Sequence, residues 1–163
     1  MTLRNIDLDQ TTLRDAYSRF PSGVVAIAAE IDGRPVGMAA SSFVPVSIDP
    51  PLVAVCLQKK STTWPRLEVV PSIAVSVLAE SHDIAARRLA AKTGDRFAGL
   101  DLMVTAGGGV FVGGSVVWLE TTFEQKISAG DHLIVLLRIR SLEVMSDLEP
   151  IVFHGSKFRR LRF

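Results

Sequence analysis

The strongest constraint on the fold of this chain is a series of short apolar runs that are rich in valine, isoleucine and alanine. Such runs favour β-strands, and no regular alternation with helical segments separates them. An Asp32-Gly33 pair between the first two runs is typical of a tight hairpin turn. These patterns predict about six to eight strands in a mainly antiparallel barrel, not a doubly wound parallel sheet. The expected strands cover residues 22–30, 36–46, 52–58, 73–79, 116–127, 133–145 and 151–153.

Three of these strands carry information about burial. Residues 52–58 are continuously apolar, which is typical of a strand that is buried on both faces. Residues 116–127 alternate between apolar and polar side chains, which indicates one buried and one solvated face. In the strand at 133–145, Arg138 and Arg140 are expected to mark the solvated side.

A few short helices are expected beside the barrel. The first begins at Thr12, which stands three residues before Asp15 as in a capping box, and it ends before Pro21. A second helix begins near Thr63, with a proline in its first turn, where proline is tolerated. A third has Ser81 as its N-cap and an aspartate in its first turn.

Length and composition predict one soluble domain. The chain has 163 residues, so residues 1–163 form a single domain, with 1–10 and 160–163 as peripheral tails. Its net charge of +1 argues against a nucleic-acid partner, since a duplex binder usually carries a basic excess. Cys56 is the only cysteine, so secretion with an internal disulfide is not indicated. No apolar stretch approaches the roughly 20 residues of a membrane span, and we expect a cytoplasmic protein without a membrane partner.

The strong sequence motifs of catalysis are absent from the chain. Gly107 and Gly109 would need a third glycine at position 112 to complete a dinucleotide fingerprint, and that residue is Val112. There is no phosphate-binding loop of the Walker type and no serine in a nucleophile elbow. The histidines and the cysteine do not stand at metal-ligand spacing, so no metal is expected.

Two polar segments could form a binding site. Small residues at 37–43 would let a backbone approach a flat ligand closely, and Ser41 and Ser42 add hydrogen-bond donors. The alternative for this segment is a tight bend of a barrel strand. Hydroxyls and lysines at 58–65 precede a helix, whose free N–H groups suit a phosphate. The alternative here is ordinary helix capping.

Two shorter patterns add candidates. Asp95-Arg96-Phe97 places a cation beside an aromatic ring, which can hold a phosphate or stack on a base, or can simply pack at the surface. Gly130-Asp131-His132 places a histidine at the start of a strand, where it could be a donor at a site or a structural residue.

The order of these segments resembles that of the short-chain flavin reductases, the NAD(P)H:flavin oxidoreductase components of two-component monooxygenases. The resemblance covers nearly the whole chain, from about Leu13 to Leu161, and the S-x-D-P-P and G-D-H elements are its most specific parts. The segments that carry it are F-P-S-G-V-V-A-I, D-G-R-P-V-G-M-A-A-S-S-F, V-S-I-D-P-P-L-V-A-V-C-L, K-S-T-T-W, D-R-F-A-G, A-G-D-H and P-I-V-F-H-G-S-K-F.

The resemblance implies an FMN-binding split barrel of Greek-key type that works as a homodimer, with FMN or FAD near the subunit interface. His132 would lie on the nicotinamide side as the catalytic residue, and Ser61 and Thr63 would hold the flavin phosphate. Arg96 and Phe97 would lie near the phosphate or the nicotinamide cofactor. The isoalloxazine ring and ribityl chain would lie against Met38, Ala39, Ala40, Ser41, Ser42, Cys56 and Leu57.

Three positions depart from the family pattern. Ala39 stands where threonine is common, Gly107–Val110 replaces a common G-x-P, and Phe158 matches a binding position that is usually tyrosine.

The implied activity is NAD(P)H-dependent reduction of flavin by hydride transfer to N5, which supplies reduced flavin to a separate monooxygenase by diffusion. NADH or NADPH would be the co-substrate. The alternative is a split-barrel protein that binds flavin without turnover or uses a deazaflavin, because the same fold hosts such proteins.

Overall fold

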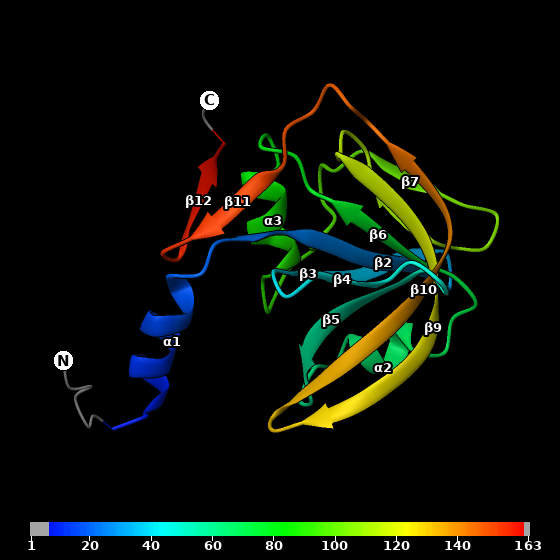
Figure 1. The fold of residues 1–163 in the computed structure, drawn as a ribbon. Helices are drawn as coiled ribbons and strands as arrows, with labels where there is room; N and C mark the ends of the chain where they lie inside the picture. Colours follow the sequence, from blue (N-terminus) through cyan, green and yellow to red (C-terminus); the bar gives the residue numbers. More distant parts are fainter. Residues whose placement is uncertain (1–6, 162–163) are drawn as a thin grey trace.

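A seven-stranded antiparallel sheet dominates the computed structural model, which describes residues 7–161 (Figure 1). Three short helices, α1 (Gln10–Ser18), α2 (Trp64–Leu67) and α3 (Asp83–Leu89), accompany the strands. The strands are β1 (Ser22–Gly23), β2 (Val25–Ile31), β3 (Arg34–Ala40), β4 (Val44–Ser47), β5 (Leu52–Gln58), β6 (Ile73–Val77), β7 (Leu102–Val104), β8 (Val110–Val112), β9 (Val117–Ala129), β10 (His132–Val144), β11 (Ile151–His154) and β12 (Lys157–Arg160).

The main sheet has the strand order β3-β2-β6-β9-β10-β5-β4, and every pair is antiparallel. The long strands β9 and β10 form a hairpin around Gly130, which has a φ of +60° that glycine adopts without strain. The sheet is strongly curved, so that β3 and β5 approach each other across it. The expected antiparallel split barrel is therefore confirmed.

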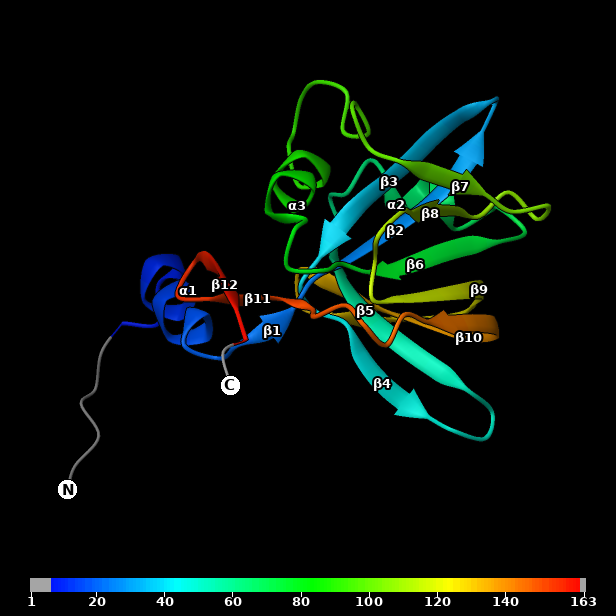
Figure 2. The same cartoon turned by 90° about the horizontal axis from the view of Figure 1, so that it is seen from above.

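A small second sheet, β1-β11-β12, extends away from the barrel together with α1 (Figure 2). The backbone N–H of Gly155 in the β11–β12 turn donates to the carbonyl of Ser18 at the end of α1, at 2.8 Å. Leu13, Ala16 and Tyr17 stand at helical spacing on α1, but α1 buries none of its residues within this chain. Tyr17 and Phe20 are exposed.

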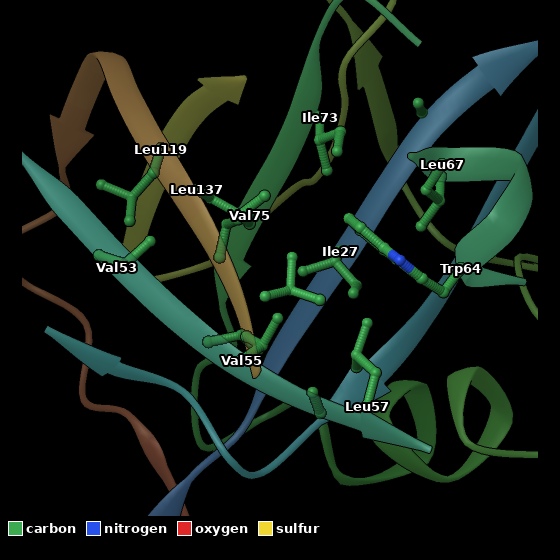
Figure 3. Packing of buried hydrophobic residues seen from close by; sticks show 14 of the residues in the cluster. Ile27, Val53, Val55, Leu57, Trp64, Leu67, Ile73, Val75, Leu119 and Leu137 are labelled. Atoms are coloured by element: carbon green, nitrogen blue, oxygen red, sulfur yellow. The ribbon is translucent and has the colours of Figure 1, made fainter. Parts of the chain in front are cut away.

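The main core lies inside the curled sheet (Figure 3). Alternate residues of β2 point into it, including Ile27, while their neighbours Ala26 and Ala28 pack in a second cluster that involves α3. Both faces of β2 are therefore buried, which explains its continuous apolar sequence. The labelled members of the main core are Ile27, Val53, Val55, Leu57, Trp64, Leu67, Ile73, Val75, Leu119 and Leu137.

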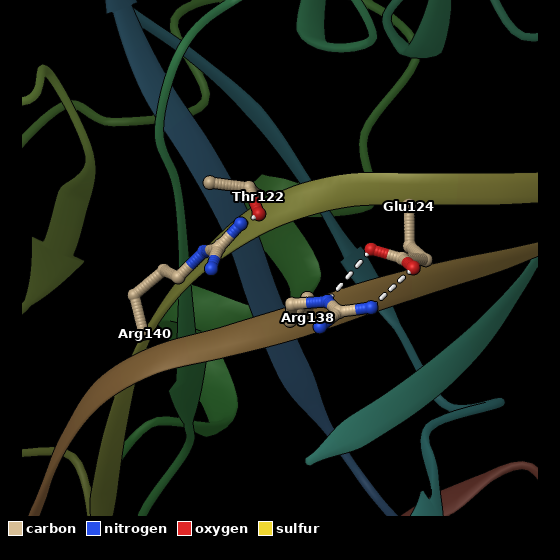
Figure 4. A network of polar contacts seen from close by, with 4 residues as sticks. All are labelled: Thr122, Glu124, Arg138 and Arg140. Atoms are coloured by element: carbon tan, nitrogen blue, oxygen red, sulfur yellow. Dashed lines mark hydrogen bonds and ion pairs between the residues drawn. The ribbon is translucent and has the colours of Figure 1, made fainter. Parts of the chain in front are cut away.

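The outer face of the β9–β10 hairpin is polar, as the alternating sequence predicts. The guanidinium of Arg138 donates two hydrogen bonds to the carboxylate of Glu124, at 2.8 and 2.6 Å, and Arg140 donates to the Thr122 hydroxyl at 3.0 Å (Figure 4). The Arg138 hydrogen bond lowers the pKa of Glu124. Such a two-pronged pair fixes the relative position of neighbouring strands.

Several element boundaries differ from the expected ones. The N-cap of α1 is Asp9, whose carboxylate accepts from the backbone N–H of Thr12, so Thr12 lies inside the helix. The N-cap of α3 is His82 instead of Ser81. The strand expected at 36–46 is split into β3 and β4 by the turn at 41–43.

Three short strands, β7, β8 and β12, were not predicted. β7 and β8 flank the glycines at 107–109, which form a turn between them and not a loose loop. Of the expected peripheral tails, residues 1–6 and 162–163 lie outside the described residues, whereas Gln10 begins α1 and Arg160 ends β12. No helix within residues 7–161 is long and apolar enough to cross a bilayer.

Candidate functional site

A cleft of about 690 Å³ lies between the end of β3 and the end of β5. One wall is the end of β3 and the turn that follows it, and the other is the end of β5 with the segment that leads into α2. The start of β10 and the segment after α3 complete the cleft. Its lining residues are Met38, Ala39, Ala40, Ser41, Ser42, Cys56, Leu57, Gln58, Lys60, Ser61, Thr62, Thr63, Ala90, Lys92, Arg96 and His132.

The β3 wall is an open strand edge. β3 pairs with β2 on one side only, and the guanidinium of Arg96 donates to the carbonyl of Gly37 from the other side, at 3.0 Å. Alternate residues of an antiparallel strand direct their N–H and C=O groups to the same side. The N–H and C=O of Ala39 therefore face the cleft as well. A flat ligand whose rim carries amide-like donors and acceptors can pair with this edge.

The Ser42 side chain bonds to the backbone of β5 on the opposite wall of the cleft. Its hydroxyl oxygen accepts from the N–H of Cys56 at 2.8 Å and its O–H donates to the carbonyl of Cys56 at 2.9 Å. The side chain thus replaces a backbone partner just before the start of β4, whose first pair is Val44 with Ala54. The Ser42 side chain bonds both the N–H and the C=O of Cys56, so the backbone of residues 40–42 is not needed as their partner.

The segment before α2 holds two hydroxyls in fixed orientations. The Ser61 oxygen accepts from the backbone N–H groups of Thr63 and Trp64, at 3.3 and 3.2 Å. Ser61 therefore caps these two amides, which is the helix-capping alternative for this segment. The Ser61 proton makes only a long contact of 4.0 Å with the Met38 sulfur, so it can turn to a ligand.

Arg96 connects three segments around the cleft. Its Nε donates to the carbonyl of Ala91 at 2.7 Å, and its Nη1 donates both to Gly37, as described, and to the Thr63 hydroxyl oxygen at 3.0 Å. Thr63 is only 9% exposed, so this contact lies in a largely dry place. The side chain thus joins the segment after α3 to β3 and to the entry into α2.

His132 lies at the first position of β10, opposite Gln58 in the register. Its Nδ1 is 2.7 Å from the carboxylate of Asp131, whose pKa is lowered by this hydrogen bond. An ionised carboxylate only accepts, so Nδ1 carries the proton in this contact. The Nε2 atom is then left to interact with a ligand, with the ring held in one orientation.

The electrostatic character of the cleft is positive. Lys60, Lys92 and Arg96 line it, and among residues 7–161 no aspartate or glutamate does. Asp131, the neighbour of His132, is exposed to solvent and paired with that histidine. A cleft of this composition favours an anionic ligand.

Two of the expected binding residues lie elsewhere. Phe97 is 7% exposed and packs in the second core cluster with Leu89 and Val110, because it follows Arg96 and points to the opposite side of the chain. Phe158 packs against Phe153 and under the guanidinium of Arg87. It lines a smaller hollow that shares 39–41 with the cleft. The structure thus brings all the other expected residues together in one cleft and leaves these two outside it.

No pattern in the sequence pointed to Ala90 and Lys92 as cleft residues. They enter the cleft because α3 packs across β3, a tertiary contact that no local pattern announces. Gln58, Lys60 and Thr62 were parts of a polar segment already considered, although no role was expected for them individually.

The fold is an antiparallel split barrel, and its cleft combines an open strand edge, two hydroxyls and three cations. The comparison with known proteins makes this more specific. The chain belongs to the flavin reductase like domain family, whose model matches residues 17–162.

Three similar proteins illustrate the family. The chain is 40% identical to an actinorhodin polyketide dimerase from Streptomyces coelicolor, over 94% of this chain and 87% of that protein. It is 31% identical to a reductase subunit of a flavin-dependent monooxygenase from Rhodococcus jostii, over 93% and 77% of the two chains. The structure of an NADH:FAD oxidoreductase from Streptomyces globisporus superposes with a TM-score of 0.91 at 33% identity, covering 98% of each chain.

Proposed function

We propose that this protein is an NAD(P)H-dependent flavin reductase that supplies reduced flavin to a separate monooxygenase. The observation that carries the proposal is the cleft, in which an open strand edge, fixed hydroxyls and unpaired cations lie together. The rim of an isoalloxazine ring carries amide-like donors and acceptors, and the other end of FMN or FAD is anionic. The strand edge therefore suits the ring of a flavin, and the cations suit its phosphate.

The chain's own groups would bind and orient the ligand. The backbone of residues 38–42 would pair with the ring, while Cys56 and Leu57 would cover the chain that links the ring to phosphate. The hydroxyl groups of Ser61 and Thr63 would donate hydrogen bonds to the phosphate, and Lys60 would supply positive charge. When bound, a flavin accepts a hydride from a nicotinamide, and the protein contributes position and exclusion of water.

His132 is the side chain we propose for the nicotinamide side of the cleft. Its ring is held by Asp131 at 2.7 Å, and Nε2 is available to a bound ligand. In this place it would orient the reductant or stabilise negative charge on the ring system. This role requires no nucleophile.

The names of the relatives support the partner class. One is the reductase subunit of a monooxygenase, and a structure that superposes with a TM-score of 0.87 at 32% identity is the flavin reductase component of a two-component tryptophan halogenase. A reductant drawn from the nicotinamide pool supports action in the cytoplasm. The polyketide dimerase is named for a different reaction, so a test of this chain has to measure free flavin turnover directly.

We also propose that the protein works as a homodimer. Tyr17 on α1 and Phe20 just after it are 70% and 78% exposed, and Val46 on β4 and Ile48 just after that strand are 51% and 94% exposed. Apolar side chains at these exposures favour burial against a second copy. Light scattering coupled to gel filtration would show twice the mass of one chain, and a monomer at micromolar concentration would contradict the proposal.

The decisive experiment is NADH and NADPH oxidation by the purified protein, with and without added FMN, FAD or riboflavin. Oxidation that rises and saturates with free flavin is the expected result. Flavin binding detected by fluorescence quenching without any oxidation would instead favour the alternative, a flavin-binding or deazaflavin-using protein. The absence of both would refute the assignment of the cleft.

A further inference from the structure

We propose that Arg96 is a positioning residue that directs the Thr63 hydroxyl toward the phosphate of the flavin, and that the preference for phosphorylated flavins depends on this contact. The inference rests on the proposed function, because it concerns the same cleft. It assigns to Arg96 a role through Thr63, beyond a general attraction of its charge for an anion.

The contact with Arg96 fixes the direction of the Thr63 hydroxyl proton. A guanidinium carries no acceptor, so in the 3.0 Å contact between Arg96 Nη1 and Thr63 Oγ1 the hydroxyl oxygen must accept. The hydroxyl proton then points away from Arg96. Within residues 7–161 no acceptor receives this proton, although Thr63 is only 9% exposed and lines the cleft. An anionic oxygen bound in the cleft would accept the hydrogen bond that the Thr63 hydroxyl leaves unmade.

The neighbouring donors in this segment are backbone amides. The backbone N–H groups of Thr63 and Trp64 already donate to Ser61, so they are not available to a phosphate. The Ser61 and Thr63 protons therefore replace the amides as the short-range donors of this segment. A site that reads a phosphate through two hydroxyls depends on their orientation, and Arg96 sets one of them.

The hydrogen-bonding geometry of Arg96 can be separated from its positive charge. Lys60 and Lys92 also line the cleft, so the loss of one positive charge leaves two in place. A lysine at position 96 keeps the charge, but its single ammonium cannot reproduce the planar fork that contacts Ala91, Gly37 and Thr63 together. Arg96→Lys therefore removes the positioning while it retains the charge.

The experiment is a double-mutant cycle read out as the ratio of the dissociation constants of riboflavin and FMN, measured by fluorescence. The variants are Arg96→Lys, Thr63→Val and the double variant. We expect each single change to weaken FMN roughly tenfold with little effect on riboflavin, as for a hydrogen bond to a charged group. The double variant should be no worse than either single variant, since both remove the same contact.

Arg88→Lys is the matched control. The Arg88 guanidinium also donates to a backbone carbonyl, that of Ala98, but it lies outside the cleft. This variant should leave the ratio unchanged. Thr63→Ser, which retains a hydroxyl, should preserve the preference for FMN when Arg96 is present and lose it in the Arg96→Lys background. This pair also keeps the test informative if Thr63→Val does not fold.

The outcomes separate the two proposals. If the wild-type protein binds neither flavin, the proposed function fails and the inference fails with it. If it binds riboflavin and FMN equally well, or if the effects of Arg96→Lys and Thr63→Val multiply in the double variant, flavin binding stands and only the role of Arg96 is refuted. A preserved ratio in Arg96→Lys alone would have the same meaning, since charge would then suffice.

Discussion

Replacing Gly37 by alanine should destabilise the protein through the contact between β2 and β3. A Cβ atom at this position would lie 2.6 Å from the Cβ and 2.9 Å from the Cα of Ala28, and closer still to the carbonyl oxygen of Ile27. These atoms belong to the backbone or to the first atom of a side chain, so none can rotate away. Ala28 is completely buried, and the second core cluster holds it in place.

The magnitude follows from this lack of room. Overpacking of a close-packed core costs about 1–3 kcal/mol, and the absence of a flexible neighbour favours the upper part of that range, about 2–3 kcal/mol. For a domain of this size each kcal/mol lowers the melting temperature by about 2–4 °C, so Gly37→Ala should melt about 4–12 °C lower. The carbonyl of Gly37 also accepts from Arg96, so the displaced strand should bind FMN more weakly.

Thermal unfolding followed by circular dichroism measures the effect, and the chain offers a matched control. Gly23 has no heavy atom within 4 Å of the position its Cβ would take, and it lies in a strand as Gly37 does. Gly23→Ala should therefore be neutral or slightly stabilising. If Gly37→Ala and Gly23→Ala melt at the same temperature as the wild type, the close approach of β2 and β3 is not what requires glycine, and the reasoning fails.

Three further predictions concern single side chains. Burial lowers the pKa of His82, whose Nδ1 accepts a hydrogen bond from the Ala79 N–H, so the folded state resists protonation of this ring. The melting temperature should therefore fall as the pH drops below about 6.5, and His82→Asn should remove this part of the pH dependence. Ser42→Ala removes the side-chain partner of the Cys56 N–H and C=O, which are exposed to water, and should cost about 0.5–1.5 kcal/mol in chemical denaturation, while an unchanged midpoint would contradict the bridging role. His132→Ala should lower flavin-dependent NADH oxidation or raise the NADH requirement while flavin still binds, and unchanged kinetics would exclude His132 from the site.

The fold was predictable because its main signals are local. The alternation in β9 follows from burial on one face and is visible without a structure. The continuous apolar run of β5 predicted burial on both faces, but this was wrong for the end of the strand, where Cys56 and Gln58 are exposed because that face borders the cleft. The helix starts were less accurate. Asp9 and Thr12 are both acceptable caps by residue type, and only the backbone conformation decides that Asp9 accepts the first free N–H.

Short strands escaped prediction for a different reason. β7, β8 and β12 contain three or four residues each, and their pairing depends on partners that are brought close by the barrel. The glycines between β7 and β8 look like a flexible patch in sequence, yet the Gly108 carbonyl accepts from Glu30 at 2.7 Å, across the end of β2. Such a contact leaves no periodic trace.

The candidate cleft could be predicted only in part. The segments at 38–42 and 56–63 stand out by small residues and hydroxyls, and the structure brings them together. The functions of individual donors could not be predicted, because Ser61 has the same residue type whether it caps amides or faces a ligand. Phe97 illustrates the converse case, since its neighbour Arg96 enters the cleft while the ring turns into the core.

The open edge of β3 links stability to binding in this barrel. An unpaired edge in a sheet leaves N–H and C=O groups that would otherwise recruit another strand. Here Arg96 occupies one of them at Gly37, and α3 covers the neighbouring segment, so the edge is protected except at Ala39 and the turn that follows. The barrel thus stays open at one short stretch, and that stretch is where a flat ligand can complete the sheet. Changes that close or cover this edge should therefore raise stability and weaken flavin binding together.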